Sequence, residues 1–219
     1  MRLDSAGWPF IGGALAAAIG LAVAASWVLA IPFLLLAALF AFFFRDPERR
    51  VPDCQHEILS PADGRVLFAG PAMAEAAPPG AWQQISIFLS PMDVHVNRVP
   101  VSGRVTRVTF RSGRSLPAYH DNSAAANRRS EVWIDHDGQT IVMRQVVGIL
   151  ARRVVCRLRE GAQVRAGDRF GIMKFGSRMD VFLPQQATLT VKVGDIVRGG
   201  ETVIAVLREI GSSGPPGIG

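Results

Sequence analysis

The sequence predicts a mostly β protein, in which an antiparallel β domain follows an N-terminal membrane helical hairpin. Three observations lead to this prediction. Residues 5–44 contain no charged side chain, the rest of the 219-residue chain is rich in short Val- and Ile-containing runs, and one β-hairpin pattern occurs twice. A chain of this length accommodates one substantial domain and an appendage. The predicted parts are therefore a hairpin (1–50), a β-rich domain (51–210) and a flexible tail (211–219).

The N-terminal apolar run is long enough for two membrane crossings. A helix spans the hydrocarbon core with about 20 residues, so we expect two short helices, Pro9–Ala25 and Val28–Phe44. Trp27 and Pro32 are expected to mark the reversal between them. One long tilted span is an alternative, and a secretory signal cleaved near Ala24 is another.

A basic cluster of Arg45, Arg49 and Arg50 follows the apolar run. Basic residues next to a membrane segment favour the cytoplasmic face and attract anionic lipid headgroups. We therefore expect a cell-membrane protein whose β domain lies on the cytoplasmic side. The net charge of +6 is otherwise spread over single arginines and forms no basic stripe with interleaved aromatic residues, which argues against nucleic acid as a partner.

Residues 51–210 have the pattern of short strands. The clearest candidates are "WQQISIFLS", "GRVTRVTF", "SEVWIDHDGQTIVMRQVVG" and "ATLTVKV". Asp137-Gly138 between two apolar-rich runs is a strong signal for a tight β-hairpin, and a short helix is predicted near Asp121–Arg129. Cys54 and Cys156 lie far apart and outside any CxxC pattern, so we expect neither a metal site nor a disulfide framework.

One β-hairpin unit occurs twice, in "GAQVRAGDRF" (161–170) and "GDIVRGGETV" (194–203). Glycine allows the turns, and the valine and the last apolar residue of each unit are expected to point inward. The unit is similar to those of barrel-sandwich hybrid folds, which include biotinyl and lipoyl carriers and membrane-fusion adaptors. An alternative function is therefore a non-enzymatic, membrane-anchored adaptor, or a carrier that uses Lys174 in "IMKFGS" between the two units.

A second resemblance depends on three motifs that occur in order. The motifs are "LSPADGRV" (59–66), "FLSPMDVHVNRVPVSGRV" (88–105) and "KFGSRMDVFLP" (174–184). Their order and spacing resemble those of phosphatidylserine decarboxylases, and the resemblance extends from about Phe44 to Leu207. It is closest to the short bacterial and archaeal-type branch, in which "FFRDPERR" follows a membrane segment.

The resemblance implies a self-cleaving, pyruvoyl-dependent enzyme. Decarboxylation of an amino acid leaves a carbanion, which needs an electron sink. In this family a serine attacks the carbonyl of the preceding glycine and elimination then cuts the chain, here at Gly176-Ser177. The products would be a β chain (1–176) and an α chain (177–219) that begins with a pyruvoyl derived from Ser177, in a heterodimer that could pair again. A Schiff base with phosphatidylserine would then release CO₂ and leave phosphatidylethanolamine.

The resemblance also implies roles for two further residues. His95 in "DVHVNRVP" matches a family histidine that assists decarboxylation, and Asp63 in "PADG" matches an aspartate that orients the base for self-cleavage. Longer relatives carry a second histidine three residues after the first, where this sequence has Arg98. Because arginine is no base at neutral pH, either His95 serves both stages or another group, such as His120 in "AYHDNS", takes the processing role.

The substrate headgroup carries a phosphate and a carboxylate, which call for arginine or backbone donors. The candidates near the motifs are Arg98, Arg111, Arg114 and Arg128. A second Gly-Ser pair, Gly211-Ser212, lies in the low-complexity tail with no strand after it. Cutting there would leave a pyruvoyl on a disordered octapeptide, so we reject this second pair as a cleavage site.

Overall fold

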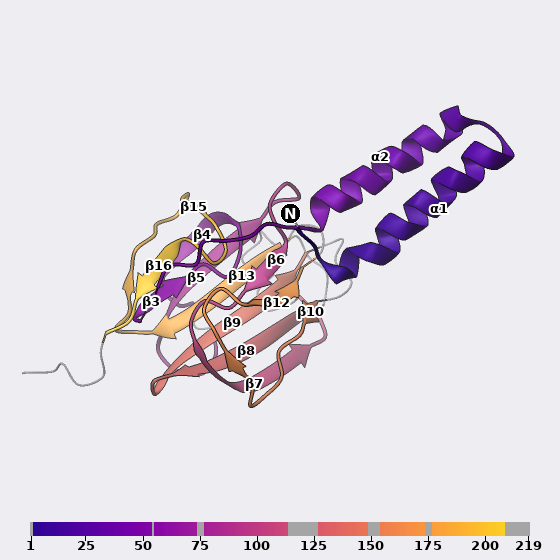
Figure 1. The fold of residues 1–219 in the computed structure, drawn as a ribbon. Coiled ribbons are helices and arrows are strands. Elements are labelled where there is room, and N and C mark those ends of the chain that lie inside the picture. The colour runs from indigo at the N-terminus through magenta and orange to yellow at the C-terminus, as the bar shows by residue number, and fades with distance from the viewer. Residues whose placement is uncertain are drawn as a thin grey trace, which may run out of the picture.

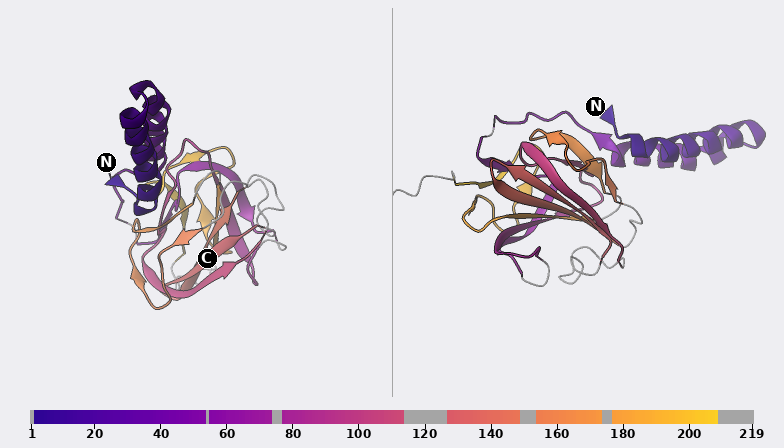
Figure 2. Two further views of the ribbon diagram at one scale, coloured as in Figure 1. Left: turned by 90° about the vertical axis from the view of Figure 1, so that its right-hand side faces the viewer. Right: turned by 90° about the horizontal axis from the view of Figure 1, so that it is seen from below.

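The computed structural model describes residues 2–53, 55–73, 77–113, 127–148, 154–173 and 177–208. It has two parts, a helical hairpin and a β domain, and the hairpin projects from one end of the β domain (Figure 1). The two views in Figure 2 show the same arrangement from other sides. The predicted fold class, a mostly β antiparallel domain after an apolar hairpin, is confirmed.

Two apolar helices form the hairpin, α1 (Trp8–Ala24) and α2 (Trp27–Phe43), and a 3₁₀ turn, η1 (Ser5–Gly7), precedes α1. The predicted pair of helices is confirmed to within one residue at each end. The continuous helical stretch 5–24 is long and apolar enough to cross a membrane, whereas α2 is shorter.

The predicted position of the reversal is wrong in one respect. The chain turns at Ala25 and Ser26, and the Ser26 side chain caps α2 by accepting a hydrogen bond from the Val28 amide (3.2 Å). Pro32 lies inside α2. A serine N-cap satisfies an amide at the start of a helix, so the polar residue, and not the proline, determines where α2 begins.

The β domain consists of short strands joined by turns. In chain order these strands are β1 (Arg2–Leu3), β2 (Arg45–Asp46), β3 (Glu57–Leu59), β4 (Gly64–Pro71), β5 (Trp82–Leu89), β6 (Val96–Arg98), β7 (Gly103–Arg111), β8 (Arg129–His136), β9 (Gln139–Val147), β10 (Val155–Cys156), β11 (Gln163–Val164), β12 (Arg169–Ile172), β13 (Ser177–Pro184), β14 (Thr188–Leu189), β15 (Ile196–Val197) and β16 (Val203–Val206). A curled eight-stranded sheet has the order β11-β7-β8-β9-β13-β5-β4-β15. Two three-stranded sheets have the orders β10-β12-β6 and β14-β16-β3, and β1 pairs with β2.

Two local predictions in this region have different outcomes. Asp137-Gly138 joins β8 to β9 with positive φ at both residues (49° and 81°), as the expected tight hairpin turn requires. The short helix predicted near Asp121–Arg129 falls mainly on residues 121–126, outside the described residues. Its last residue, Arg129, begins strand β8, so that end of the prediction is wrong.

The duplicated unit has the same surroundings in both copies. Val164 of β11 pairs with Gly103 at the start of β7, and Val197 of β15 pairs with Gly64 at the start of β4. Both glycines have positive φ (157° and 153°), and a Cβ on either would overlap a carbonyl oxygen of the next strand, that of Asp135 or Phe88. The duplication therefore extends to the strands that each unit pairs with.

One face of the eight-stranded sheet, the inner face, carries the hydrophobic core. Met179, Val181 and Leu183 of β13 belong to this core together with Phe170 of β12 and Ile204 of β16. Because side chains alternate along a strand, even-numbered residues of β13 lie on the opposite, outer face. The core therefore fills the space between the eight-stranded sheet and the two smaller sheets.

The base of the hairpin is fastened to the β domain by ionic and apolar contacts. The Asp4 carboxylate accepts two hydrogen bonds from the Arg157 guanidinium (2.7 and 2.8 Å), and Arg45 donates to the Met92 carbonyl (2.6 Å). Phe43 and Phe44 form a separate buried cluster with Val94, Val96 and Ile172. The end of α2 thus packs directly on the region of β6 and β12.

Candidate active site

Ser177 is the first residue of β13, a strand that is paired on both sides. It pairs with Leu89 of β5 and with Val147 of β9, and its side chain shares the inner face with Met179. Ser177 is fully buried, and its Oγ has no hydrogen-bond partner in the described part of the chain. Buried polar atoms in proteins nearly always have a partner, so an unpartnered buried hydroxyl marks a place where chemistry can occur.

The residues after Ser177 are held by a buried ion pair on the outer face. Arg178 donates from Nε to Asp180 Oδ1 (2.6 Å) and from Nη2 to Ser86 Oγ of β5 (2.8 Å). Arg178 and Asp180 are 3% and 0% exposed. Together with the pairing to β5 and β9, these bonds hold residues 178–180 of β13 in place.

His95 is a neutral, fully buried imidazole just before β6. Its Nδ1 lies 2.9 Å from the Asp93 carbonyl, which can only accept, so Nδ1 carries the hydrogen and Nε2 carries a lone pair. Nε2 is buried and without a partner among the residues described. Burial lowers the pKa of His95 from 6.5 to about 4, against the opposing effect of the bond to Asp93. His95 is therefore arranged to accept a proton at neutral pH.

The last residue of helix α2 packs against the His95 ring. The Phe43 ring at the end of α2 lies against the imidazole with 4.1 Å between ring centroids. Arg45, two residues later, adds a positive charge that also lowers the pKa of His95. The end of α2 is thus in direct contact with a candidate catalytic residue.

Backbone pairing brings His95 to the segment that leads into Ser177. The His95 carbonyl accepts a hydrogen bond from the Met173 amide (3.2 Å), and Val96 pairs with Ile172. Met173 precedes Ser177 by four residues, which span at most about 14 Å when fully extended. His95 therefore bonds a residue that lies only four positions before Ser177 in the chain.

A buried amide network lies on the inner face of the eight-stranded sheet, and it was not predicted from the sequence. Ser130 donates to Gln145 Oε1 (2.6 Å), and Gln145 Nε2 donates to Asn97 Oδ1 (2.7 Å). Asn97 is fully buried, and its Nδ2 has no partner within the described ranges. Asn97 follows His95 by two residues in an extended segment, so the alternation of side chains was the signal that could have identified it.

Asp63 lies in the turn before β4, where its carboxylate binds the linker that follows the hairpin. Arg49 donates to both carboxylate oxygens (2.9 and 2.7 Å), and the Gly199 amide donates to Oδ1 (2.8 Å). Arg49 also bonds Glu201 (3.2 Å). These contacts account for Asp63 as a structural residue, and its role in orienting a base stays a prediction.

The side chain of Arg98 lies on the opposite side of β6 from that of Asn97. Its guanidinium donates to Asp46 (3.0 Å), to the Pro47 carbonyl (2.9 Å) and to the Gly167 carbonyl (3.0 Å). Arg169 also pairs with Asp46. Arg98 therefore holds the linker after the hairpin, as Arg49 does, whereas its place in the sequence made it a candidate headgroup ligand.

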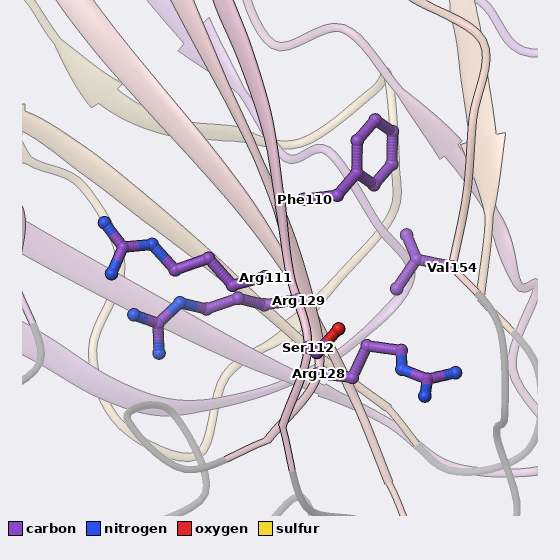
Figure 3. A pocket seen from close by; sticks show the side chains of 6 residues that line it. All are labelled: Phe110, Arg111, Ser112, Arg128, Arg129 and Val154. Atoms are coloured by element: carbon purple, nitrogen blue, oxygen red, sulfur yellow. The ribbon is translucent and has the colours of Figure 1, made fainter.

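A pocket of about 160 Å³ lies at the end of the sheet where β7 ends and β8 begins. Its lining residues are Phe110, Arg111, Ser112, Arg128, Arg129 and Val154. Figure 3 shows that Arg128 extends on the side of Val154, whereas Arg111 and Arg129 point together in the opposite direction. The Arg128 carbonyl accepts a hydrogen bond from the Val147 amide (3.2 Å), and Val147 pairs with Ser177. This pocket is therefore at the Ser177 end of the sheet.

Several residues singled out in the sequence lie outside the described residues: Lys174, Gly176, His120, Arg114, Gly211 and Ser212. Their proposed or rejected roles stay predictions. Within the described ranges, no cluster of three His, Cys, Asp or Glu side chains could hold a metal ion.

Comparison with known proteins identifies one family. The pattern of the family described as "Phosphatidylserine decarboxylase" matches residues 36–205. A protein of Pelodictyon phaeoclathratiforme is 45% identical over 171 residues, which cover 78% of this chain and 80% of that protein. One from Oleidesulfovibrio alaskensis is 41% identical over 204 residues, 93% of each chain. One from Nitrosomonas europaea is 38% identical over 200 residues, 91% of this chain and 92% of the relative. All three are called "Phosphatidylserine decarboxylase proenzyme".

Proposed function

Because the chain belongs to the phosphatidylserine decarboxylase family, we propose that it acts through a pyruvoyl group which it makes from Ser177. Membership makes it an enzyme of this type, which removes CO₂ from phosphatidylserine and leaves phosphatidylethanolamine. The observation that carries the proposal is the buried, unpartnered Ser177 Oγ at the start of β13, on the segment that also meets His95.

The residues around Ser177 fit a prosthetic group that is made from the chain. Such a group needs no binding pocket of its own, only a hydroxyl beside a peptide bond and a base near it. Once formed, it supplies a carbonyl that takes up the substrate amine and withdraws the electrons that CO₂ leaves behind. The name "proenzyme" of the relatives agrees with a chain that must be cut before it acts.

The proposed cut between Gly176 and Ser177 proceeds in three steps. Ser177 Oγ adds to the carbonyl carbon of Gly176, the bond from that carbon to the Ser177 nitrogen breaks, and the nitrogen takes up a proton, which leaves an ester. Loss of the Ser177 α-proton then breaks the bond between Cβ and Oγ, which frees the carboxylate of chain 1–176 and leaves a double bond between Cα and Cβ. A proton adds to Cβ as the double bond moves to Cα and nitrogen, and water then adds to Cα and releases the nitrogen as ammonia.

His95 is the proposed base in both stages, self-cleavage and decarboxylation. Its Nε2 lone pair can accept the Ser177 hydroxyl proton, because Nδ1 already donates to Asp93 and the low pKa keeps the ring neutral. After the cut, the same nitrogen can carry a proton to the carbon that has lost CO₂. One neutral histidine in this place makes a second histidine at position 98 unnecessary.

The fold keeps the cleaved chains together. β13 pairs with β5 and β9 of the other chain from its first residue, and Arg178 bonds Ser86 across the strands. Six further β13 positions after Ser177 lie in the buried part of the sheet. The new end of the α chain is therefore held between two strands of the β chain, in a heterodimer of residues 1–176 and 177–219.

The hairpin and the pocket lined by Arg128 are the parts of the protein that we expect to bind the lipid substrate. Apolar helices that end at the His95 environment suit a substrate whose acyl chains lie in the membrane. Arg128 lies at the Ser177 end of the sheet and suits the headgroup phosphate. Arg45, Arg49 and Arg50 favour the cytoplasmic side of the cell membrane.

The test compares two serine substitutions in the full chain. Ser177→Ala should abolish both chain cutting and release of labelled CO₂ from phosphatidylserine vesicles, because no hydroxyl remains to attack. Ser212→Ala is the matched control in the second Gly-Ser pair and should change neither. Activity in Ser177→Ala, or loss of activity in Ser212→Ala alone, would contradict the assignment.

His95→Ala separates the two stages. Acid–base groups contribute about 10²- to 10⁴-fold to a rate, and a cut that happens once per molecule tolerates such a loss whereas turnover does not. The variant should therefore be cut slowly and, once cut, release almost no CO₂. Normal turnover by cut His95→Ala would remove this residue from the mechanism.

A further inference from the structure

We propose that Asn97 supplies the hydrogen-bond donor that stabilises the anionic oxygen formed when Ser177 attacks the preceding carbonyl. This inference rests on the self-cleavage proposed above and assigns that step a residue which neither the motifs nor the family resemblance singled out. The addition moves the carbonyl π electrons onto oxygen, so the developing charge needs a donor in a site closed to water. The Asn97 amide is such a donor.

The hydrogen-bond network orients the Asn97 amide. Ser130 donates to Gln145 Oε1, Gln145 presents Nε2 to Asn97, and Asn97 accepts with Oδ1. The two N–H groups of Asn97 Nδ2 then point away from Gln145. Nδ2 is buried and has no partner among the described residues. A buried amide that leaves its donors unused is expensive in free energy, and such exceptions occur at functional sites.

The strand register directs this donor to the interior layer that contains Ser177. Gln145 and Val147 lie on the same face of β9, and they pair with Met179 and Ser177 of β13. Asn97 contacts Gln145 from the neighbouring small sheet. His95, two residues before Asn97, bonds the chain that leads to Ser177. The Asn97–Gln145 bond and the His95–Met173 bond therefore connect both residues to the Ser177 end of β13, one through strand β9 and one along the chain.

His95 and Asn97 then have complementary roles at the peptide bond that precedes Ser177. His95 Nε2 accepts the proton of the attacking hydroxyl, and Asn97 Nδ2 donates to the oxygen that gains the electron pair. The amide is neutral and is held by Gln145 before the reaction starts, so little reorganisation is needed. Asn97 would act in this way on the uncut chain, before any substrate binds.

The test measures the rate of chain cutting on denaturing gels after a pulse of synthesis, which needs no decarboxylation assay. Asn97→Ala removes the donor, and Asn97→Asp keeps an acceptor for Gln145 but replaces the donor with oxygen. Both should cut about 10²- to 10³-fold more slowly, the usual loss of one oxyanion donor. Gln145→Met leaves Asn97 in place without its partner and should slow cutting by less. Gln84→Ala, a buried amide on the outer face, should cut at the wild-type rate.

The outcomes distinguish this inference from the proposed function. Thermal unfolding of each variant in an uncut Ser177→Ala background shows whether it folds. If Asn97→Asp cuts normally, the network serves only to hold β6 against β9, and the inference is wrong. It is also wrong if both Asn97 variants cut normally and lose turnover. A wild-type chain that is never cut would instead overturn the proposed function itself.

Discussion

The buried imidazole of His95 should make the folded protein lose stability between pH 6.5 and pH 4. Burial lowers its pKa from 6.5 to about 4, so in this window the unfolded chain binds a proton that the folded chain does not. Above pH 6.5 the His95 ring is neutral in both states and does not reduce the free energy of unfolding. As the pH falls from 6.5 toward the folded pKa, protonation of the unfolded chain lowers the free energy of unfolding. One pKa unit corresponds to about 1.4 kcal/mol, which gives a loss of about 3 kcal/mol at pH 4.

The measurement is chemical unfolding in detergent at pH 7, 5.5 and 4. The reference chain carries Ser177→Ala, so that every molecule is uncut, and the second chain adds His95→Gln, which cannot take up a proton. Carboxylates that titrate in the same range affect both chains alike. The reference should lose about 3 kcal/mol more than the His95→Gln chain between pH 7 and pH 4. Parallel pH profiles would refute the reasoning, because the imidazole would then not be buried in its neutral form.

Three further predictions concern contacts around the site. Phe43→Ala should expose the His95 ring and raise its pKa toward 6.5, as measured by NMR titration of the imidazole; an unchanged pKa would show that the hairpin does not shield it. Arg128→Gln should raise KM for phosphatidylserine with little change in kcat, whereas Arg111→Gln, on the opposite side in Figure 3, should leave KM unchanged; equal effects would refute the phosphate assignment. Asp63→Asn should lower the free energy of unfolding by about 1–3 kcal/mol, because a charge-assisted pair with its arginine is lost; an unchanged unfolding midpoint with slow cutting would instead support the base-orienting role.

The features that sequence analysis predicted correctly are those encoded by local pattern. The charge-free run gave two helices, Asp137-Gly138 gave the hairpin turn, and the duplicated motif gave two equivalent β units. Each depends on a few neighbouring residues whose physical preferences agree with the fold. Pro32 does not mark the turn of the N-terminal hairpin, because α2 continues through it, whereas the Ser26 side chain satisfies the Val28 amide at the start of α2.

The features that could not be predicted depend on contacts between distant segments. The bond between Asn97 and Gln145 joins residues 48 positions apart, and it forms only because β6 packs over β9. Arg98 was grouped with the headgroup ligands from its closeness to His95 in sequence. Alternation along an extended strand puts residues 95 and 97 on one side and residue 98 on the other, where Asp46 takes the guanidinium.

Self-cleavage is tested by the mass of the purified, denatured protein. We predict two fragments, residues 1–176 and 177–219, and the smaller of the two should have no free amino group and resist Edman sequencing. Treatment with a hydrazine should modify the smaller fragment alone, since it alone would carry a ketone. A single intact chain of 219 residues, or a second fragment that begins with an unmodified serine at position 177, would contradict pyruvoyl formation at Ser177.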